Sequence, residues 1–410
     1  MIDPTHDPSS PESSRDDAMD ASPVEGLDAA SQPAHAVHIP TVFRLEPKIE
    51  EQRMLEVALD FLERSSTASP RVAAMSTGRG QAAEGIARRF PDANVLLWYI
   101  DLFHCQRAIE HSKLRKADLD GTGVESVVAV EAPSNLHVEC LADLPEQPFD
   151  VGLLPLVMHG EEELARDVLQ QFYDRLAVGG VLIASVDNPK DRWLHEQLKV
   201  FEKSVRVRPF ADAMVYIVEK TRPLKKRKDY SCELAFRDCD ELVRLVTRPG
   251  VFSHRQLDNG ARQLLDAVDV YPQARLIDIG CGSGSVALGV AMRDPAAQIL
   301  AVDSNARAIW CVERGRELNR LSNVSTLLSA DGVYGDADRF DMALANPPYF
   351  GDFQIAEKFV EAARRSLRPG GRLVLVTKQP NWYQENLDRW FVDCEVFPSS
   401  RYHIASGVKG

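Results

Sequence analysis

Two patterns of apolar residues alternate along most of the chain. Short continuous apolar runs are typical of buried strands, and apolar residues at three- and four-residue spacings are typical of helices with one buried face. In the first half these patterns predict a helix that begins near Pro47 and includes Leu62. They then predict, in chain order, a strand at 71–76, a helix at 81–89, strands at 94–100 and 149–154, a helix at 161–176, a strand at 181–185 and a helix at 191–202.

The same alternation begins again in the second half. Two short strands are predicted at 233–237 and 242–246. The elements predicted after them are a strand at 274–279, a helix at 285–292, a strand at 298–302, a helix at 306–319, strands at 323–328 and 341–345, a helix at 356–367, a strand at 372–377, a helix at 382–390 and strands near 394–397 and 402–405. Apolar strands joined by helices of this length indicate a mostly parallel sheet covered on both faces. The predicted fold class is therefore α/β, with two such units.

Matching residues at fixed separations indicate that the two units are copies of one another. The pairs separated by 202 positions are Gly78 and Gly280, Gly80 and Gly282, and Asp101 and Asp303. The pairs separated by 191 positions are Phe149-Asp150 and Phe340-Asp341, and Gly179-Gly180 and Gly370-Gly371. These landmarks predict an internal duplication.

The copies differ at polar positions. The aligned positions that differ are Ser76 and Asp278, Ala82 and Gly284, and residues 155–158 and 346–349. Because the first unit lacks a carboxylate and polar acceptors that the second unit has, we predict that the second unit is catalytic and the first is a scaffold or binding module.

Charge is unevenly distributed along the chain. The formal net charge is −13 at pH 7, but residues 1–40 hold eight acidic residues and a single arginine. This segment lacks Phe, Trp and Tyr, so it cannot bury enough apolar surface to fold. Between the two units lies a basic cluster, Lys220, Arg222, Lys225, Lys226, Arg227 and Lys228. The cluster either contacts phosphates or keeps a linker solvated.

Together these features predict four segments and several absences. The segments are a disordered acidic tail at 1–42, a degenerate unit at 43–219, a basic linker at 220–230 and a catalytic unit at 231–410. The seven cysteines are scattered without a Cys-x-x-Cys pair, so neither a disulfide framework nor a metal site is expected. No apolar run is long enough to cross a bilayer and the chain does not begin with a signal-peptide pattern, so a cytoplasmic location is expected.

A glycine-rich turn follows the strand at 274–279. Glycines permit a tight turn and close approach by a ligand, and the helix that follows offers free N–H groups. A nicotinamide dinucleotide fold would require Gly-x-Gly-x-x-Gly, and the acid two residues before the first glycine would repel a pyrophosphate. That acid, Asp278, can instead face a cationic amino group, which fits the amino-acid end of S-adenosylmethionine. The predicted cofactor residues of the loop are Asp278, Gly280, Cys281, Gly282 and Gly284.

Acids after the next two strands complete the predicted cofactor site. Asp303 ends the second strand, where a carboxylate accepts both ribose hydroxyls, and Ser304 beside it is grouped with the cofactor residues. Asp331 follows the third strand and is placed to reach the adenine amine, although an Asp-Gly pair is also a common turn. Cys281 is interpreted as a small buried neighbour of the loop, because no base stands near it in the sequence.

The fourth strand of this unit is stopped by Asn346-Pro347-Pro348-Tyr349. Proline cannot donate a ladder hydrogen bond, so the strand ends here. The Asn346 side-chain carbonyl and the Pro347 backbone carbonyl can accept the hydrogens of an exocyclic NH2 group while the Tyr349 ring stacks on a planar ligand. By itself an Asn-Pro dipeptide is usually an ordinary loop. Because this stretch follows a cofactor loop and an acid placed to bind ribose, we predict that it is the site of methyl transfer. The predicted catalytic residues are Asn346, Pro347, Pro348 and Tyr349, and Asn346 is also predicted to lie at the edge of the cofactor site.

This set of motifs resembles a known family. The glycine loop, the acid after the second strand and the Asn-Pro-Pro-Tyr stretch resemble class I S-adenosylmethionine-dependent methyltransferases that act on a conjugated NH2 nitrogen. Residues 248–253 (Arg-Pro-Gly-Val-Phe-Ser), with Leu257-Asp258 and Gly260, are more specifically similar to bacterial ribosomal RNA guanine-N2 methyltransferases, both the C type for small-subunit RNA and the related G type for large-subunit RNA. The motifs cover roughly residues 245–380. The chain differs from that family in its acidic tail, its basic linker and Tyr349-Phe350, where Phe-His is usual.

The resemblance implies a fold and a reaction. The fold would be two tandem Rossmann-like methyltransferase domains with seven-stranded sheets, the first domain being degenerate. The reaction would be methyl transfer from S-adenosylmethionine to guanine N2, with ribosomal RNA or a ribosomal subunit as partner. Independently of the resemblance, we expect no metal, no membrane partner and a monomer. The same motif also serves adenine N6 in RNA or DNA and a protein glutamine amide. A non-catalytic RNA-binding assembly factor is a further alternative, against which the intact Asp278, Asp303 and Asn346 argue.

Overall fold

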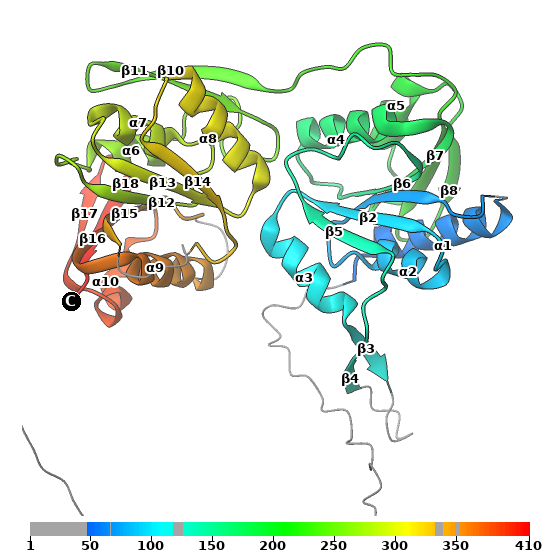
Figure 1. Cartoon of the computed structure of the whole chain (residues 1–410), viewed down its shortest axis with the longest axis horizontal. Helices are drawn as coiled ribbons and strands as arrows, with labels where there is room; N and C mark the ends of the chain where they lie inside the picture. The colour runs from blue at the N-terminus through cyan, green and yellow to red at the C-terminus, as the bar shows by residue number, and fades with distance from the viewer. Residues whose placement is uncertain (1–46, 66, 118–125, 333–338, 349–352) are drawn as a thin grey trace, which may run out of the picture.

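The structure is a computed structural model in which residues 47–65, 67–117, 126–332, 339–348 and 353–410 are described. The acidic tail expected at 1–42 lies outside these residues. Two lobes lie side by side, and each contains one seven-stranded sheet (Figure 1). The predicted α/β fold with two tandem units is therefore confirmed.

The amino-terminal lobe has the strand order β5-β2-β1-β6-β7-β9-β8. Its strands are β1 (Arg71–Met75), β2 (Asn94–Tyr99), β5 (Leu136–Cys140), β6 (Phe149–Leu156), β7 (Leu176–Val186), β8 (Arg206–Pro209) and β9 (Met214–Glu219). One face is covered by α1 (Ile49–Arg64), α2 (Gln81–Arg89) and α3 (Leu102–Ser112), and the other by α4 (Glu162–Arg175) and α5 (Trp193–Phe201). Val72 and Ala74 pack in the first core and Ala73 in the second, which explains why a strand buried on both faces is apolar throughout.

The carboxyl-terminal lobe repeats this order as β14-β13-β12-β15-β16-β18-β17. Its strands are β12 (Arg275–Ile279), β13 (Gln298–Asp303), β14 (Val324–Leu328), β15 (Phe340–Ala345), β16 (Leu367–Thr377), β17 (Val392–Ser399) and β18 (Tyr402–Val408). One face is covered by α6 (Asn259–Asp266), α7 (Ser285–Arg293), α8 (Ala306–Leu318) and the hairpin of β10 (Cys232–Asp238) and β11 (Glu241–Thr247), and the other by α9 (Gln354–Ser366), α10 (Pro380–Asn386) and a short 3-10 helix (Leu387–Arg389). The shared order supports the predicted duplication.

The structure corrects the alignment of the two copies in their first parts. The elements β1, α2 and β2 begin 204 residues before β12, α7 and β13, not 202. Gly80 and Gly284 are the true counterparts, because each caps the following helix in the left-handed region, with φ of 81° and 84°. A Gly-x-Gly pattern also matches Gly-x-Gly-x-Gly when it is shifted by two positions, and this ambiguity explains the error.

The corrected alignment removes both carboxylates from the amino-terminal lobe. Ala74 occupies the position equivalent to Asp278, and Tyr99 occupies the position equivalent to Asp303. The expected pairs of Ser76 with Asp278 and of Ala82 with Gly284 are therefore wrong. The separation of 191 holds farther on, since β6 and β15 begin 191 residues apart, as do β7 and β16.

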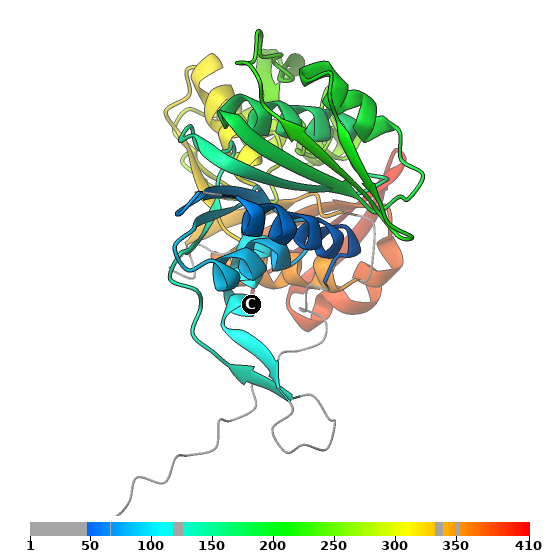
Figure 2. The ribbon, with the colours of Figure 1, turned by 90° about the vertical axis from the view of Figure 1, so that its right-hand side faces the viewer.

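Several elements were not predicted from the sequence. They are α3, β5, β8, β9, α6 and a hairpin of β3 (Leu114–Ala117) and β4 (Ser126–Ala129) that projects from the amino-terminal lobe (Figure 2). Strand β8 is exposed along its whole length and β5 alternates between exposed and half-buried residues, so neither produces a continuous apolar run. No helix among the described residues is long and apolar enough to cross a lipid bilayer.

Candidate active site

The glycine loop between β12 and α7 has a backbone that only glycine adopts easily. Gly280, Gly282 and Gly284 have φ of 73°, 54° and 84°. A Cβ atom at Gly284 would lie 2.8 Å from Val312 Cγ2, whereas a Cβ atom at Gly282 would meet no atom within 4 Å. The loop is therefore packed against the lobe at Gly284 and open at Gly282, where a ligand can approach the backbone.

Asp278 lies in β12 directly beneath this loop. Its side chain is buried, and Oδ2 accepts a hydrogen bond from the Ala287 N–H of α7 at 3.1 Å. Burial raises the pKa of Asp278 to about 7, and the nearby Asp303 carboxylate adds to the rise while the Ala287 bond opposes it. A carboxylate desolvated in this way gains most from a cationic partner.

Asp303 connects the end of β13 to the glycine loop. Its Oδ2 accepts from the Gly282 N–H at 2.8 Å and its Oδ1 accepts from the Asn305 N–H at 2.9 Å. Burial raises the pKa of Asp303 even though these backbone bonds lower it. The structure thus brings Asp278, Asp303 and the open glycine together at one end of the parallel strands, where ligands bind in open α/β sheets.

The other predicted cofactor residues are placed less centrally. Asp331 is exposed, and its Oδ1 accepts from the Ser329 hydroxyl at 2.6 Å. Cys281 is buried, and burial raises the pKa of its thiol well above the ordinary value, so the thiol stays protonated. Ser304 faces the other lobe, where its hydroxyl donates to Asp101 Oδ2 at 2.6 Å. The roles assigned to these three residues stay predictions.

Asn346 follows β15 and is held by a residue that the sequence analysis named without a role. Its Nδ2 donates to Asp258 Oδ2 at 2.7 Å, and the same oxygen accepts from the Ala261 N–H at 2.8 Å. Because an ionised carboxylate can only accept, the amide atom facing it must be the nitrogen, and Asn346 Oδ1 is directed away from Asp258. Pro347 is buried and Pro348 is exposed, while Tyr349 lies outside the described residues.

The contact made by Asp258 is therefore the main feature of the site that the sequence did not reveal. It is the N-cap of α6 and reaches Asn346 across 88 residues of chain. A sequence signal for the cap existed, because Asp-Asn-Gly before an apolar helical stretch is a typical helix start. No local signal could indicate the contact with Asn346.

The corresponding loop of the amino-terminal lobe is filled by side chains of the lobe itself. Glu51 of α1 is fully buried, and its Oε1 accepts from the N–H groups of Thr77 and Gly78 at 3.0 and 3.2 Å and from the Ser76 hydroxyl. Tyr99 occupies the position equivalent to Asp303 of the other lobe, and its hydroxyl donates to Gly78 O at 3.0 Å. The groups that would bind a cofactor are already used within the lobe.

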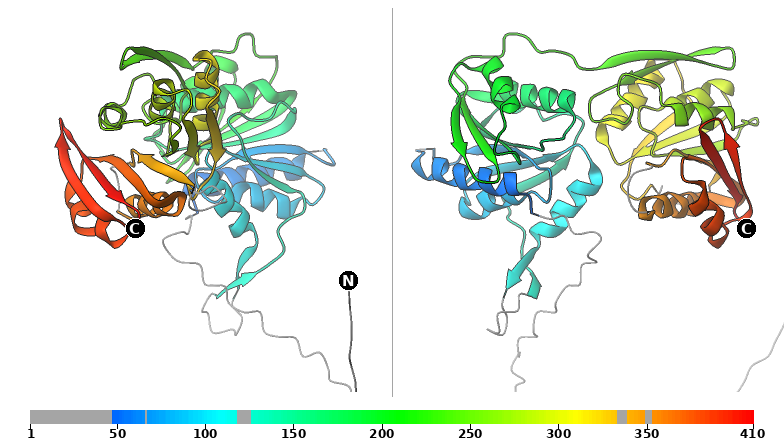
Figure 3. Two further views of the ribbon diagram at one scale, coloured as in Figure 1. Left: turned by 60° about the vertical axis from the view of Figure 1, so that its left-hand side comes forward. Right: turned by 180° about the vertical axis from the view of Figure 1, so that it is seen from behind.

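The amino-terminal lobe contacts the end of β13, close to the cofactor site. The N–H of Leu102 donates to Ser304 O at 2.8 Å. The N–H of Ala306 donates to Ile100 O, also at 2.8 Å. Figure 3 shows α3, which begins at Leu102, on the side of its lobe that faces the other lobe. The two lobes are therefore joined by backbone hydrogen bonds where the carboxyl ends of β2 and β13 meet.

A buried arginine strengthens this junction. Arg307 in α8 has Nη2 at 2.7 Å from Asp167 Oδ2, and its Nε donates to Ala142 O at 2.9 Å. Next to it, Arg248 binds the Asp143 carboxylate through two nitrogens, at 2.5 and 2.9 Å. Burial raises and Arg248 lowers the pKa of Asp143, and the net result is a pKa below the usual range. Charged residues of one lobe thus require partners from the other.

The residues of the carboxyl-terminal lobe fit S-adenosylmethionine. The open backbone at Gly282 provides room for the ligand, the buried Asp278 suits an ammonium group and Asp303 offers carboxylate oxygens at the adjacent strand end. Within the described residues, no group of three or more His, Cys, Asp or Glu side chains is arranged to hold a metal ion.

Comparisons with known proteins show which proteins this chain resembles. Residues 242–406 match the family model described as methyltransferase small domain. A Pseudoalteromonas atlantica protein named ribosomal RNA small subunit methyltransferase C is 30% identical over 156 residues, which are 37% of this chain and 45% of that protein. The Pseudomonas entomophila protein of the same name is 25% identical over 326 residues, 77% of this chain and 89% of that protein.

A solved structure resembles both lobes together. It is the 16S rRNA N2 methyltransferase RsmC of T. thermophilus in complex with AdoMet and guanosine, with a TM-score of 0.69 and 18% identity over 90% of this chain and 98% of that chain. The family match makes residues 242–406 similar to methyltransferase small domains, and the strand order of the lobe agrees with the Rossmann-like fold that the sequence predicted. As a whole, the chain resembles the ribosomal RNA small subunit methyltransferases C.

Proposed function

We propose that this protein is an enzyme that transfers a methyl group from S-adenosylmethionine to the exocyclic N2 amine of a guanine in ribosomal RNA. The observation that carries the proposal is the orientation of the Asn346 amide, whose nitrogen donates to Asp258 Oδ2 at 2.7 Å, so that its oxygen is directed away from Asp258. The names of the small-subunit relatives support ribosomal RNA as the substrate, and the similar solved structure, an rRNA N2 methyltransferase in complex with guanosine, supports guanine as the target. The reaction would take place in the cytoplasm on ribosomal RNA or an assembled subunit, with a monomeric enzyme.

Each cofactor contact is assigned to a residue whose chemistry suits it. Asp278 would bind the amino-acid end, Asp303 the ribose hydroxyls and Asp331 the adenine amine. Bound S-adenosylmethionine supplies a methyl group on a sulfonium, which is already a good leaving group. The main task of the protein is then alignment.

The protein must also make a weak nucleophile available. The lone pair of an aromatic amine is delocalised into its ring, so the nitrogen reacts poorly. Asn346 Oδ1 and the Pro347 carbonyl would each accept one N–H hydrogen, which favours a pyramidal nitrogen with its lone pair directed outward. Tyr349 would hold the base by stacking, and the proton would leave to water after transfer.

Asp258 is proposed as a positioning residue in this reaction. By holding Asn346 Nδ2, it prevents the amide from rotating to present a donor to the substrate amine. Its negative charge also polarises the amide, which makes Oδ1 a stronger acceptor as positive charge develops on the target nitrogen.

The amino-terminal lobe is proposed to support folding and RNA docking without catalysing transfer. Its glycine loop is filled by Glu51 and Tyr99, and its residues 155–158 (Pro-Leu-Val-Met) replace the Asn-Pro-Pro-Tyr stretch. On this basis residues 43–219 form a degenerate domain and residues 231–410 form the catalytic domain.

The decisive test is nucleoside mass spectrometry of ribosomal RNA from cells with and without the gene. We expect N2-methylguanosine at one position to be lost without the gene and restored in vitro by the purified protein with S-adenosylmethionine. The Asn346→Ala variant should restore it at least about a hundredfold more slowly, while calorimetry shows nearly unchanged cofactor binding. If the N2-methylguanosine content is the same in ribosomal RNA from cells with and without the gene, the guanine assignment is overturned. If the purified protein does not bind S-adenosylmethionine, a non-catalytic assembly factor is favoured.

A further inference from the structure

The start of the basic linker, residues 220–230, is fixed to the amino-terminal lobe. Lys220 is buried, and its ammonium group donates to two backbone carbonyls at the end of α4, at 2.8 and 2.6 Å. The Tyr173 hydroxyl lies 3.0 Å from the carbonyl oxygen of Arg222. One of the six basic residues of the cluster, Lys220, is therefore used inside the fold.

The end of the linker is fixed in the same way. Gln170 of α4 exchanges two hydrogen bonds with the backbone of Lys228, at 2.7 and 2.9 Å. The Tyr230 side chain that follows is buried. A flexible tether would not require these contacts, so the segment between the two attachments is held in a defined place.

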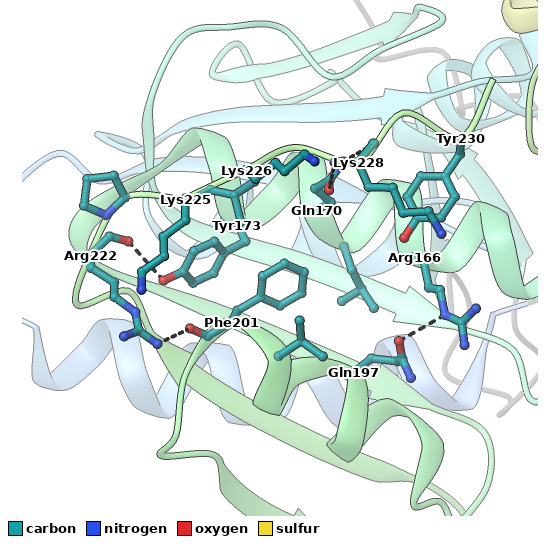
Figure 4. Close-up of a pocket in the computed structure, with 14 residues that line it drawn as sticks. Arg166, Gln170, Tyr173, Gln197, Phe201, Arg222, Lys225, Lys226, Lys228 and Tyr230 are labelled. Carbon is teal, nitrogen blue, oxygen red and sulfur yellow. Dashed lines mark hydrogen bonds between the residues drawn. The ribbon is translucent and has the colours of Figure 1, made fainter.

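A cavity of about 420 Å³ lies between this segment and helices α4 and α5. Figure 4 shows Lys225, Lys226 and Lys228 along its linker side, with the rings of Tyr173 and Phe201 beneath them. The cationic residues that line the cavity are Arg166, Arg222, Lys225, Lys226 and Lys228, and no carboxylate is among the lining residues.

The lysines of the segment carry charge that the protein does not neutralise. Arg166 is paired with Glu162 at 2.6 Å, but Lys225, Lys226 and Lys228 form no ion pair within the part of the chain that the structure describes. These three lysines are exposed and lie within four positions of one another. Ammonium groups repel one another when they are separated by less than the Debye length, which is about 8 Å at physiological salt. A bound polyanion would relieve such repulsion among neighbouring lysines.

The aromatic rings of the cavity indicate what kind of contact it can make. Tyr173 and Phe201 are stacked on one another, with centroids 4.8 Å apart, and the Lys228 ammonium covers the Tyr230 ring at 4.5 Å. Because these faces are already in use, the site is poorly suited to stacking of bases. Ammonium groups on flexible side chains suit phosphate oxygens instead.

We propose that the lysines of this fixed segment bind the phosphodiester backbone of the ribosomal RNA substrate and that the cavity accommodates part of that strand. The inference rests on the proposed function, because it takes RNA as the substrate. Binding here is independent of base sequence and adds affinity at a place in the amino-terminal lobe, whereas Asn346 selects the target in the other lobe.

The test is an equilibrium titration of the full-length protein with a fluorescently labelled transcript of small-subunit ribosomal RNA at several salt concentrations. The double variant Lys225→Ala/Lys226→Ala should bind about tenfold more weakly at 0.1 M salt. The slope of log affinity against log salt should become shallower by about 1.5, because each lost phosphate contact contributes about 0.7 to 0.9. Calorimetry with S-adenosylmethionine and a thermal melt check that the variant is folded.

The matched control is Lys113→Ala/Lys190→Ala, which removes the same charge from exposed lysines outside the linker. It should retain the RNA affinity and salt slope of the unmodified protein. Equal weakening in both double variants would reduce the effect to net charge and overturn the inference, as would unchanged binding by the linker variant. Methyl transfer is measured separately with the same transcript. If the unmodified protein methylates no guanine but the linker variant still binds RNA more weakly than it, the proposed function is refuted and the inference about the linker stands.

Discussion

At the scale of single residues, we propose different tasks for two acids of the candidate site. Asp258 caps α6 and holds the Asn346 amide through one oxygen, so a structural bond and a positioning bond share an atom. Asp278 is buried under the glycine loop, and its pKa is raised to about 7, mainly by burial. Each task leads to a prediction that separates it from a purely structural role.

For Asp258 we predict different effects of serine and asparagine. Asp258→Ser keeps an N-cap but is too short to reach Asn346, so stability should stay within about 1 kcal/mol while kcat falls about tenfold or more. Asp258→Asn retains one acceptor oxygen for both donors but lacks the negative charge, so its kcat should lie between that of Asp258→Ser and that of the unmodified protein. The measurement is single-turnover methylation with urea denaturation of each variant. Normal kcat in Asp258→Ser would show that the contact does not position Asn346.

For Asp278 we predict a pH dependence of cofactor affinity. The charged carboxylate binds the ammonium group, so affinity is fully present well above pH 7 and falls as the pH drops below the free-protein pKa, by up to about tenfold per pH unit. Calorimetry between pH 6 and 8.5 measures this. Methylthioadenosine, which lacks the amino group, should lose less affinity over the same range, and an equal loss for both ligands would contradict the assignment to Asp278.

At the scale of elements, the strand-loop-helix unit is used twice with opposite results. In the carboxyl-terminal lobe the turn leaves Gly282 open, whereas in the amino-terminal lobe Glu51 and Tyr99 close the same turn. The left-handed cap is retained in both, at Gly80 and Gly284, because the path of the chain from strand to helix requires it. The fold of the turn therefore depends on its capping glycine, and we propose that ligand binding depends on Gly282.

The two glycines of the open turn should respond differently to alanine. Gly284→Ala adds left-handed strain and a contact of 2.8 Å with Val312, so we expect a loss of about 2 kcal/mol or more in unfolding free energy. Gly282→Ala adds strain alone, about 1 kcal/mol, but its methyl group would fill the open space and weaken cofactor binding. Urea denaturation and calorimetry measure both effects. A larger stability loss for Gly282→Ala would contradict the packing described.

At the scale of the whole molecule, the lobes are joined by backbone bonds beside the cofactor site and by buried ion pairs. Arg307 is fully buried and Asp167 nearly so, which means that each charge depends on its partner from the other lobe. The amino-terminal lobe thus supports the segment that carries Asp303.

Breaking one ion pair should reveal this dependence. Arg307→Ala leaves the Asp167 carboxylate buried without its partner, and we expect a loss of about 3 to 5 kcal/mol in unfolding free energy. The double variant Arg307→Met/Asp167→Leu removes both charges and should recover most of that loss. Scanning calorimetry and urea denaturation test this. A double variant no more stable than Arg307→Ala would mean that the loss comes from packing.

The sequence by itself determined the order of most helices and strands, the duplication and the candidate residues at the strand ends. These features follow from periodic apolar residues, glycines and prolines, whose effects on the backbone are local. Exposed or half-buried elements such as β5 and β8 were missed, because little apolar surface marks them. The two-residue error in the alignment arose because repeated glycines fit more than one register.

Only the tertiary structure decided how these residues combine. It joined Asp258 to Asn346 across 88 residues, closed the amino-terminal loop with Glu51 and fixed the basic linker against α4. Such contacts depend on how whole elements pack, and a carboxylate or a lysine has the same local signal whatever partner it finds. The positions of the chemical groups were thus readable from the sequence, and their partners required the fold.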